Sequence, residues 1–300
     1  MNEPALQRLR ESQNADGGWG PYAGGQSRTE STALALLALL AEDAERARRA
    51  GAWLAERQLP DGSWSAGDAL PAASWMGSLA VLALAATPDG AEAARRGGVW
   101  LLETEGRGHA WWTRTLMRLF GRASSVELDP GLTGWPWTDG SFSWVEPTSY
   151  SLLALRAMRD ELPADRTAAR IRSGEAMLLD RMCEGGGWNY GNSRVLGQEL
   201  WPYPDTTAVA LLALHGARSR PGISLSLGAL EGMTEEVESG LSLALAILCF
   251  RRYGRPTGEL AERLRGRVEE TGLLGETRAL ALATLALDPR PNLLAGDADA

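Results

Sequence analysis

The stretch Gln58-Leu59-Pro60-Asp61-Gly62-Ser63-Trp64 (QLPDGSW) has a near copy earlier in the chain, QNADGGW from Gln13 to Trp19. Both copies place Gly four residues after Gln and Trp two residues after Gly, with Asp directly before the Gly. The pattern returns in CEGGGW, where Met182 replaces Gln but Trp188 keeps the spacing, and more loosely in WTDGSFSW, which ends at Trp144. A turn that recurs at matched spacing indicates an internal repeat.

The spacing of these turns predicts where one repeat is enlarged. Their closing residues, Trp19, Trp64, Trp144 and Trp188, are separated by 45, 80 and 44 residues. Two separations agree, and the third is longer by roughly 35 residues, which indicates an insertion. We expect the third repeat to carry a helical insertion at about residues 106–137.

Six segments rich in Ala and Leu follow the turns and the later links, with almost no charge after their first turn. A segment of this kind predicts a helix that is buried on all sides. Between these segments lie others, such as 41–58 and 163–182, whose charged and apolar residues separate at helical spacing. Those helices are expected to face solvent on one side. The six apolar segments begin at Glu30, Ala73, Glu146, Asp205, Glu238 and Glu276.

Apolar helices that alternate with amphipathic ones, joined by short turn-rich links, predict two concentric helical layers closed into a ring. The predicted fold is all-α, a single (α/α)6 toroid of alternating inner and outer helices. A chain of 300 residues, of which 44% are hydrophobic, has enough core material for one large domain. We expect this domain at residues 1–290, with a flexible tail at 291–300.

The charge balance and the number of cysteines argue against several classes of protein. Thirty basic against 38 acidic residues give a net charge of −8, which argues against nucleic acid as a partner. Cys183 and Cys249 are too few for a disulfide framework, and no charged-then-apolar leader opens the chain. No uncharged apolar run reaches the length of a membrane span. These features predict a cytoplasmic protein.

The Gln-to-Trp turns, followed by Thr- or Ser-rich starts of Ala/Leu helices, resemble the repeats of squalene-hopene and oxidosqualene cyclases and of prenyltransferase β subunits. The resemblance covers roughly residues 3–288. It implies that the Gln amide ties helix ends together and that the Trp packs against the neighbouring turn, so these residues are structural. It also implies a lipophilic isoprenoid substrate and acid-initiated (class II type) cyclisation or isomerisation of a polyprenyl chain.

Candidate site residues lie at the starts of the six Ala/Leu helices, five of which carry a carboxylate. Ring closure would direct all six starts to one end of the toroid, so we expect these carboxylates to line one cavity. Crowding raises the pKa of at least one carboxyl group, and a protonated acid is what isoprenoid cyclisation needs. The alternative is helix capping, which favours acidic residues there by about 0.5–2 kcal/mol. The five are Glu30, Glu146, Asp205, Glu238 and Glu276.

Asp205 is the candidate catalytic acid. In class II terpene cyclases the proton donor is the middle Asp of a DxDD motif, usually followed by Thr and Ala. The stretch YPDTTA resembles that motif in its central acid only, because Tyr203 stands where the first acid belongs. Oxidosqualene cyclases resemble this chain in keeping a single Asp. The alternative is an Asp that caps its helix.

Aromatic side chains near the inner-helix starts are the candidate lining of the cavity. The chain has 12 Trp against 3 Phe. Carbocation intermediates are stabilised by cation–π attraction and quenched by water, so a cyclase needs a dry aromatic cavity. Ordinary core packing explains aromatic residues at helix ends equally well. The candidates that we expect to face the same hollow as Asp205 are Trp75, Tyr150, Trp201 and Tyr203.

Metal and cofactor sites are not expected. Zinc-dependent prenyltransferases share the toroid and bind the metal through an Asp, a Cys two residues later and a distant His, but here Thr207 occupies the Cys position. The two histidines, His109 and His215, lie in a linker and at the far end of an inner helix. A protein zinc site needs three or four close N, S or O ligands.

The insertion contains a basic amphipathic stretch, AWWTRTLMRLFGR from Ala110 to Arg122. On a helix, its Trp, Leu and Phe residues share one face and its three Arg residues share another. Such a helix can lie in the interface of an anionic bilayer, so peripheral contact with the inner face of the membrane is one expectation. A lid folded over its own toroid is the other.

Three functions stay open from the sequence. Class II cyclases generally place their cavity between two toroids, so a cyclase built from this chain would need a second toroid subunit as its partner. A noncatalytic module that binds a lipid or a protein would need only the repeats and the apolar hollow. A carbohydrate-active (α/α)6 enzyme would use the carboxylates together with Trp platforms.

Overall fold

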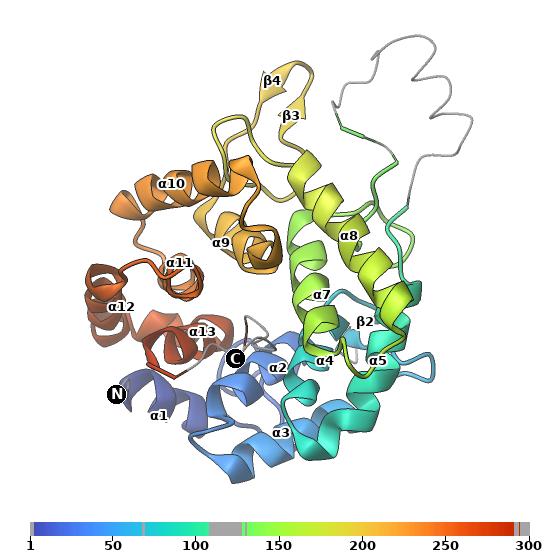
Figure 1. Cartoon of the computed structure of the whole chain (residues 1–300). Helices are drawn as coiled ribbons and strands as arrows, with labels where there is room; N and C mark the ends of the chain where they lie inside the picture. Colours follow the sequence, from blue (N-terminus) through green and yellow to red (C-terminus); the bar gives the residue numbers. More distant parts are fainter. Residues whose placement is uncertain (1–2, 68–69, 108–127, 130, 291–293, 295–300) are drawn as a thin grey trace.

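The structure is a computed structural model that describes residues 3–67, 70–107, 128–129, 131–290 and 294. Figure 1 shows helices arranged in two layers around a central axis. The inner layer consists of α2 (Thr29–Leu39), α4 (Gly77–Ala85), α7 (Val145–Ala157), α9 (Pro204–Ala213), α11 (Gly240–Arg252) and α13 (Thr277–Leu287). The outer layer consists of α1 (Glu3–Glu11), α3 (Ala44–Glu56), α5 (Ala91–Glu103), α8 (Ala164–Asp180), α10 (Pro221–Glu236) and α12 (Gly258–Thr271).

Each inner helix packs against the next one along the chain, and α13 packs against α2 to close the ring. Two backbone-anchored contacts fasten this closure, because the Thr277 backbone N–H donates to the Pro21 carbonyl at 2.8 Å and the Thr277 hydroxyl donates to the Gly20 carbonyl at 2.7 Å. The predicted all-α (α/α)6 toroid is therefore confirmed.

The inner and outer helices differ in how many of their residues are buried, as their sequences predict. In α2, every residue from Ser31 to Leu39 is buried, and the alternation of Ala with Leu lets neighbouring inner helices approach closely. In α3, only Ala47, Ala50, Trp53 and Leu54 are buried, which is one stripe of an amphipathic helix. Burial of the inner ring on all sides supplies most of the core.

Short irregular elements complete the chain. Two small antiparallel hairpins lead into inner helices: β1 (Ser65–Gly67) with β2 (Leu70–Ala73) precedes α4, and β3 (Arg194–Val195) with β4 (Gln198–Glu199) precedes α9. Among the described residues, the 3-10 turns η1 (Pro88–Gly90), η2 (His215–Ala217) and η3 (Gly272–Gly275) each connect an inner helix with an outer helix.

The repeated turns hold the helices together through the residues that define them. The indole Nε1 atoms of Trp19, Trp64 and Trp188 each donate to a carbonyl ten residues earlier, on Leu9, Leu54 and Leu178, at 2.7–2.8 Å. All three indoles are fully buried. Each Trp thus pins its turn to the end of the preceding outer helix.

The Gln side chains bridge each turn to the next outer helix. The Gln58 amide donates to the Gly62 carbonyl at 2.9 Å, within its own turn, and to the Ala93 carbonyl at 2.8 Å, in the first turn of α5. The Gln13 amide donates in the same way to Gly17 and to Arg46 of α3. The Gln and Trp residues of the turns therefore connect helix ends, which is the structural role that the sequence predicts for them.

The third turn is closed by Trp135 and not, as the spacing predicts, by Trp144. The Trp135 indole donates to the Leu101 carbonyl at 3.0 Å, 34 residues back, and its backbone N–H donates to the Thr148 hydroxyl. Trp19 and Trp188 make the same backbone contact with Thr32 and Thr207. Trp144 instead occupies the N-cap position of α7. The prediction was wrong because the Trp that makes the contacts of the repeated turn is Trp135, whereas Trp144 lies at the start of the next inner helix.

The Ala110–Arg122 stretch, which the sequence predicts to be a membrane contact or a lid, lies outside the described residues. Most of the expected tail at 291–300 lies outside them as well. Within the described ranges, no helix is both long enough and apolar enough to cross a membrane.

Candidate functional site

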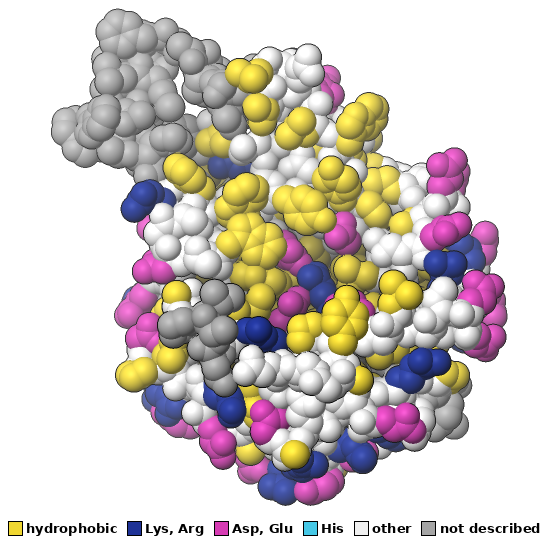
Figure 2. Space-filling view, turned by 180° about the vertical axis from the view of Figure 1, so that it is seen from behind, with side chains coloured by type: hydrophobic (Ala, Val, Ile, Leu, Met, Phe, Trp, Pro, Cys, Tyr) yellow, Lys and Arg dark blue, Asp and Glu magenta, His cyan; other side chains and the backbone are white. Residues whose placement is uncertain are grey.

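One face of the toroid is hollowed at its centre, and Figure 2 shows acidic and basic side chains inside the hollow with hydrophobic side chains around it. The charged groups that the structure brings together come from the first turns of inner helices, on α2, α7, α9 and α13. The N-terminal ends of the inner helices therefore converge on one site, as ring closure requires.

The centre of the site is Arg278, the second residue of α13. Its Nη1 atom lies 3.1 Å from Glu30 Oε1 on α2, and its Nη2 atom donates to Glu146 Oε1 on α7 at 2.5 Å. The guanidinium group thus joins three helices of the ring. Sequence reasoning missed this residue, although Arg278 is the only basic residue in the first turn of any inner helix.

Burial and ion pairing act in opposite directions on this cluster. Burial raises the pKa of both Glu30 and Glu146 above the ordinary value, and the Arg278 charge only partly offsets it. Burial opposes the charge of Arg278, but the surrounding Tyr150, Glu146 and Glu30 raise its pKa well above its usual value. The arginine therefore carries its charge at all physiological pH values.

Asp205 faces the same site from the first turn of α9. The Tyr190 hydroxyl lies 3.4 Å from Asp205 Oδ2, and the rings of Tyr190 and Tyr203 lie 5.3 Å apart. Asp205 is close enough to Glu146 that its charge contributes to the raised pKa of that group. Glu146 and Asp205 therefore lie on adjacent inner helices at the same end of the ring. Asp205 caps no backbone N–H of α9, contrary to the capping interpretation.

The other two predicted carboxylates behave differently. Glu276 caps α13, because its Oε2 atom accepts a hydrogen bond from the Ala279 backbone N–H at 2.9 Å. Its charge contributes to raising the pKa of Glu30, so it lies at the edge of the cluster. Glu238 precedes α11 with its side chain 81% exposed, 4.0 Å from Arg267 of α12. The predicted row of five carboxylates is thus a group of three, a cap and an exposed side chain.

The predicted aromatic residues divide into two sets. Trp75 packs edge-on against Trp137, with ring centroids 5.1 Å apart, and lies 5.6 Å from the ring of Tyr150. Trp75 and Tyr150 are buried in this cluster. Trp201 is 85% exposed, and Tyr203 is exposed beside Tyr190. Buried Tyr150 therefore lies beside the charged group, and the exposed pair of Tyr190 and Tyr203 lies beside Asp205.

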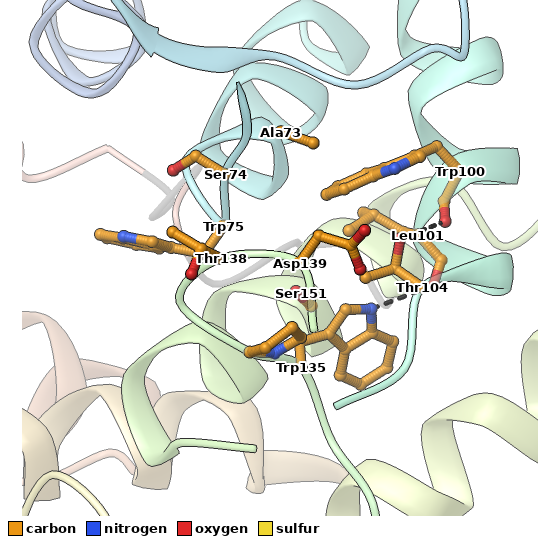
Figure 3. A pocket seen from close by; sticks show the side chains of 11 residues that line it. Ala73, Ser74, Trp75, Trp100, Leu101, Thr104, Trp135, Thr138, Asp139 and Ser151 are labelled. Atoms are coloured by element: carbon orange, nitrogen blue, oxygen red, sulfur yellow. Dashed lines mark hydrogen bonds between the residues drawn. The ribbon is translucent and has the colours of Figure 1, made fainter. Parts of the chain in front are cut away.

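A small closed space lies behind Trp75. Figure 3 shows it between the side chains of Trp75, Trp100, Trp135 and Ser151. Its volume is about 10 Å³, which is room for roughly one water molecule. The space is a packing defect beside the aromatic cluster and does not hold a substrate.

No family model matches this chain, and no curated protein matches it. Several solved structures share its fold. An alpha-amylase from Clostridium perfringens is 12% identical, with a TM-score of 0.65 over 96% of this chain and 97% of that one. An alpha-1,6-mannanase of Salegentibacter sp. HEL1_6, solved as an inactive variant with alpha-1,6-mannotriose, is 9% identical, with a TM-score of 0.62 over 95% of this chain and 98% of that one.

A family 8 glycosyl hydrolase from Klebsiella pneumoniae, the endoglucanase Cel10, is 16% identical, with a TM-score of 0.55 over 88% of this chain and 97% of that one. A type II terpene cyclase from Scytonema also matches, with a TM-score of 0.47 and 16% identity over 97% of this chain and 78% of that one. At such low identity these similarities concern the fold alone. The chain is an (α/α)6 toroid, a fold that it shares with the amylase, the mannanase and the endoglucanase.

Proposed function

We propose that the central hollow binds a carbohydrate chain and hydrolyses one of its glycosidic bonds, with Glu146 and Asp205 as the catalytic pair. The observation that carries this proposal is the placement of these two carboxyl groups in the first turns of adjacent inner helices, close enough that the charge of Asp205 acts on Glu146. Glycoside hydrolysis commonly uses two carboxyl groups on either side of the scissile bond.

The environments of the two groups suggest their roles. Burial raises the pKa of Glu146, as a general acid requires, and the ion pair with Arg278 offsets this in part. Asp205 is only half-buried and lies beside exposed Tyr190, where water has access. In the proposed step, Glu146 gives its proton to the glycosidic oxygen as the bond from C1 to that oxygen breaks. A water molecule attacks C1 and gives its proton to Asp205.

Arg278 would position Glu146 and bind substrate hydroxyl groups. Its Nε atom is buried without a hydrogen-bond partner in the described part of the chain, and the buried Tyr150 hydroxyl lies beside the guanidinium group. Buried polar groups are nearly always hydrogen-bonded, to protein, water or ligand. A hydroxyl group of a ligand would satisfy the Nε atom, whereas a hydrocarbon would leave it unsatisfied.

Exposed aromatic rings at the approach to Asp205 fit the same kind of ligand. Tyr190 and Tyr203 lie side by side and are partly open to solvent. An aromatic face offers an apolar surface to the C–H face of a sugar ring, while its hydroxyl stays available for hydrogen bonds. The solved glycosidases of this fold add support, although a shared fold does not determine function.

The proposal is tested by incubating the protein with α-1,6-mannan, β-1,4-glucan and starch and measuring the release of reducing ends. Glu146→Gln and Asp205→Asn should each lower the rate by a factor of about 10²–10⁴. Glu262→Gln, at an exposed carboxylate of α12 that pairs with Arg265, is the matched control and should keep full activity. No hydrolysis of any of these polysaccharides by the parent protein would contradict the proposal.

The second candidate is the isoprenoid function that the turn motifs imply, with Asp205 as the proton donor. The cluster of Trp75, Tyr150 and the partly buried Trp137 favours it, because aromatic faces stabilise carbocations. The fixed positive charge of Arg278 opposes it, because a cation beside a developing carbocation raises its energy. Squalene and geranylgeranyl substrates, with products identified by mass spectrometry, test this candidate.

Two partners belong to the second candidate and stay as proposals. One is a second toroid subunit, which would close the cavity over Asp205. The other is an anionic membrane surface, contacted through residues Ala110–Arg122. Binding of an isoprenoid without turnover would favour the noncatalytic module instead.

A further inference from the structure

We propose that a second cavity beside the hollow is a binding subsite for further sugar units of the same chain. The inference rests on the proposed carbohydrate function. It identifies the part of the toroid that would bind the sugar units of a long substrate outside the central hollow. The cavity has a volume of about 360 Å³ and lies between the start of α11, the end of α12 and the start of α13. Ligand sites typically have volumes of about 300–1,000 Å³.

The cavity and the central site are linked through Glu276 at the start of α13, whose charge contributes to the raised pKa of Glu30. Glu276 lines the cavity, and its carboxylate is fixed by the hydrogen bond from the Ala279 N–H. Arg278, two residues later, lies in the hollow between Glu30 and Glu146. A linear ligand that leaves the hollow along this helix end would enter the cavity.

The wall formed by η3 has an unusual backbone. Four consecutive residues have left-handed φ values: Gly272 (55°), Leu273 (49°), Leu274 (55°) and Gly275 (68°). The conformation is disfavoured for leucine, and strain of this kind clusters at ligand sites. Leu273 is buried against Gly240, where an added Cβ would lie 2.4 Å from its Cδ2 atom. Leu274 lines the cavity and is 83% exposed.

The side chains of the cavity match a sugar better than a hydrocarbon. Tyr22 lines it and is 56% exposed, so an aromatic face is open to a ligand. Glu238 and Arg267, 4.0 Å apart, also line it and offer an acceptor and several donors for hydroxyl groups. A hydrocarbon chain would remove both charged groups from water without replacing their hydrogen bonds.

The test compares short and long ligands. In the Asp205→Asn background, binding of a disaccharide and of a hexasaccharide of α-1,6-mannose and of β-1,4-glucose is measured by calorimetry. Tyr22→Ala should weaken hexasaccharide binding about tenfold, equivalent to about 1.4 kcal/mol, and leave disaccharide binding unchanged. Tyr22→Phe keeps the aromatic face and should bind both as the parent does. Leu274→Ala, which removes the other exposed wall, should repeat the length-selective loss.

The outcomes separate this inference from the proposed function. Equal hexasaccharide affinity in Tyr22→Ala and its parent, or an equal loss for both lengths, would overturn the subsite while leaving carbohydrate binding in the hollow intact. Absence of binding for all four oligosaccharides would overturn both proposals. In a protein that keeps Asp205, Tyr22→Ala should raise KM for long substrates and leave kcat unchanged.

Discussion

Arg278 of α13 and Glu146 of α7 form an ion pair of 2.5 Å between two inner helices that are not neighbours in the ring. Glu30 of α2 completes the group from a third helix. Because the partners come from distant parts of the chain, the pair can form only when the ring is closed. The ion pair therefore contributes both to the stability of the closed ring and to the charge of the central hollow.

Removal of the arginine charge should destabilise the protein strongly. Arg278→Met leaves two buried carboxylates without a counter-charge, and loss of one partner of a buried pair typically costs about 3–5 kcal/mol. The free energy of unfolding, measured in urea, checks this. Arg278→Lys keeps the charge and should lose less. A Met variant as stable as the parent would show that the cluster contributes nothing to folding.

The raised pKa of Glu146 predicts a pH dependence of stability. The folded form binds this proton more tightly than the unfolded chain, whose Glu has a pKa near 4.5. The contribution of Glu146 to stability is therefore complete below pH 4.5 and is lost as the pH rises through the higher folded-state pKa. Glu146→Gln should flatten this part of the curve of unfolding free energy against pH. Parallel curves for the two proteins would contradict the burial argument.

The turns supply a test of the repeat architecture that is independent of function. Gln58→Ala and Trp64→Ala should lower the unfolding free energy by about 1–5 kcal/mol, through lost buried hydrogen bonds and a cavity. In the third repeat, Trp135→Ala should cost more than Trp144→Ala, because only Trp135 makes the buried indole contact. The reverse order would assign the turn to Trp144 after all.

Substitution of Leu274 by glycine in the strained turn η3 should raise the stability of the protein, whereas the substitutions above lower it. Leu274→Gly relieves a left-handed backbone that costs a leucine about 1–2 kcal/mol, and its exposed side chain contributes little packing. The variant should therefore be more stable than the parent by about 1 kcal/mol. Leu273→Gly, by contrast, loses a buried side chain and should be less stable. Thermal melting curves measure both changes.

The fold could be predicted from the sequence because its signals are local and repeated. All six Ala/Leu segments became inner helices, and the Gln-to-Trp turns hold them as expected. The site was less predictable, since it depends on which side chains meet across the ring. Arg278 carries no motif, and Glu238 occupies a repeat position like that of Glu30 yet has its side chain 81% exposed. Periodicity places a helix start at one end of a toroid, but the loop before it decides where the side chain points.

The strongest test of the site is Asp205→Asn, which keeps the shape of the side chain and removes its acid–base chemistry. Among the described residues, Asp205 caps no helix N–H and has a 3.4 Å contact with the Tyr190 hydroxyl, so stability should stay within about 1 kcal/mol of the parent. Turnover should fall by a factor of about 10²–10⁴, on polysaccharides if Asp205 activates water and on isoprenoids if it donates the initiating proton.

Tyr190→Phe is the control for the Asp205→Asn variant. It removes the hydrogen bond from the Tyr190 hydroxyl to Asp205 while leaving the carboxyl group, and should lower turnover less than Asp205→Asn does. The two candidate functions are distinguished by the substrate. A loss of polysaccharide hydrolysis in Asp205→Asn supports the glycosidase, and a loss of isoprenoid conversion supports the cyclase. Full turnover by Asp205→Asn on any substrate that the parent converts would remove Asp205 from the chemistry. In that case only Glu146, held by Arg278, would be left of the proposed pair.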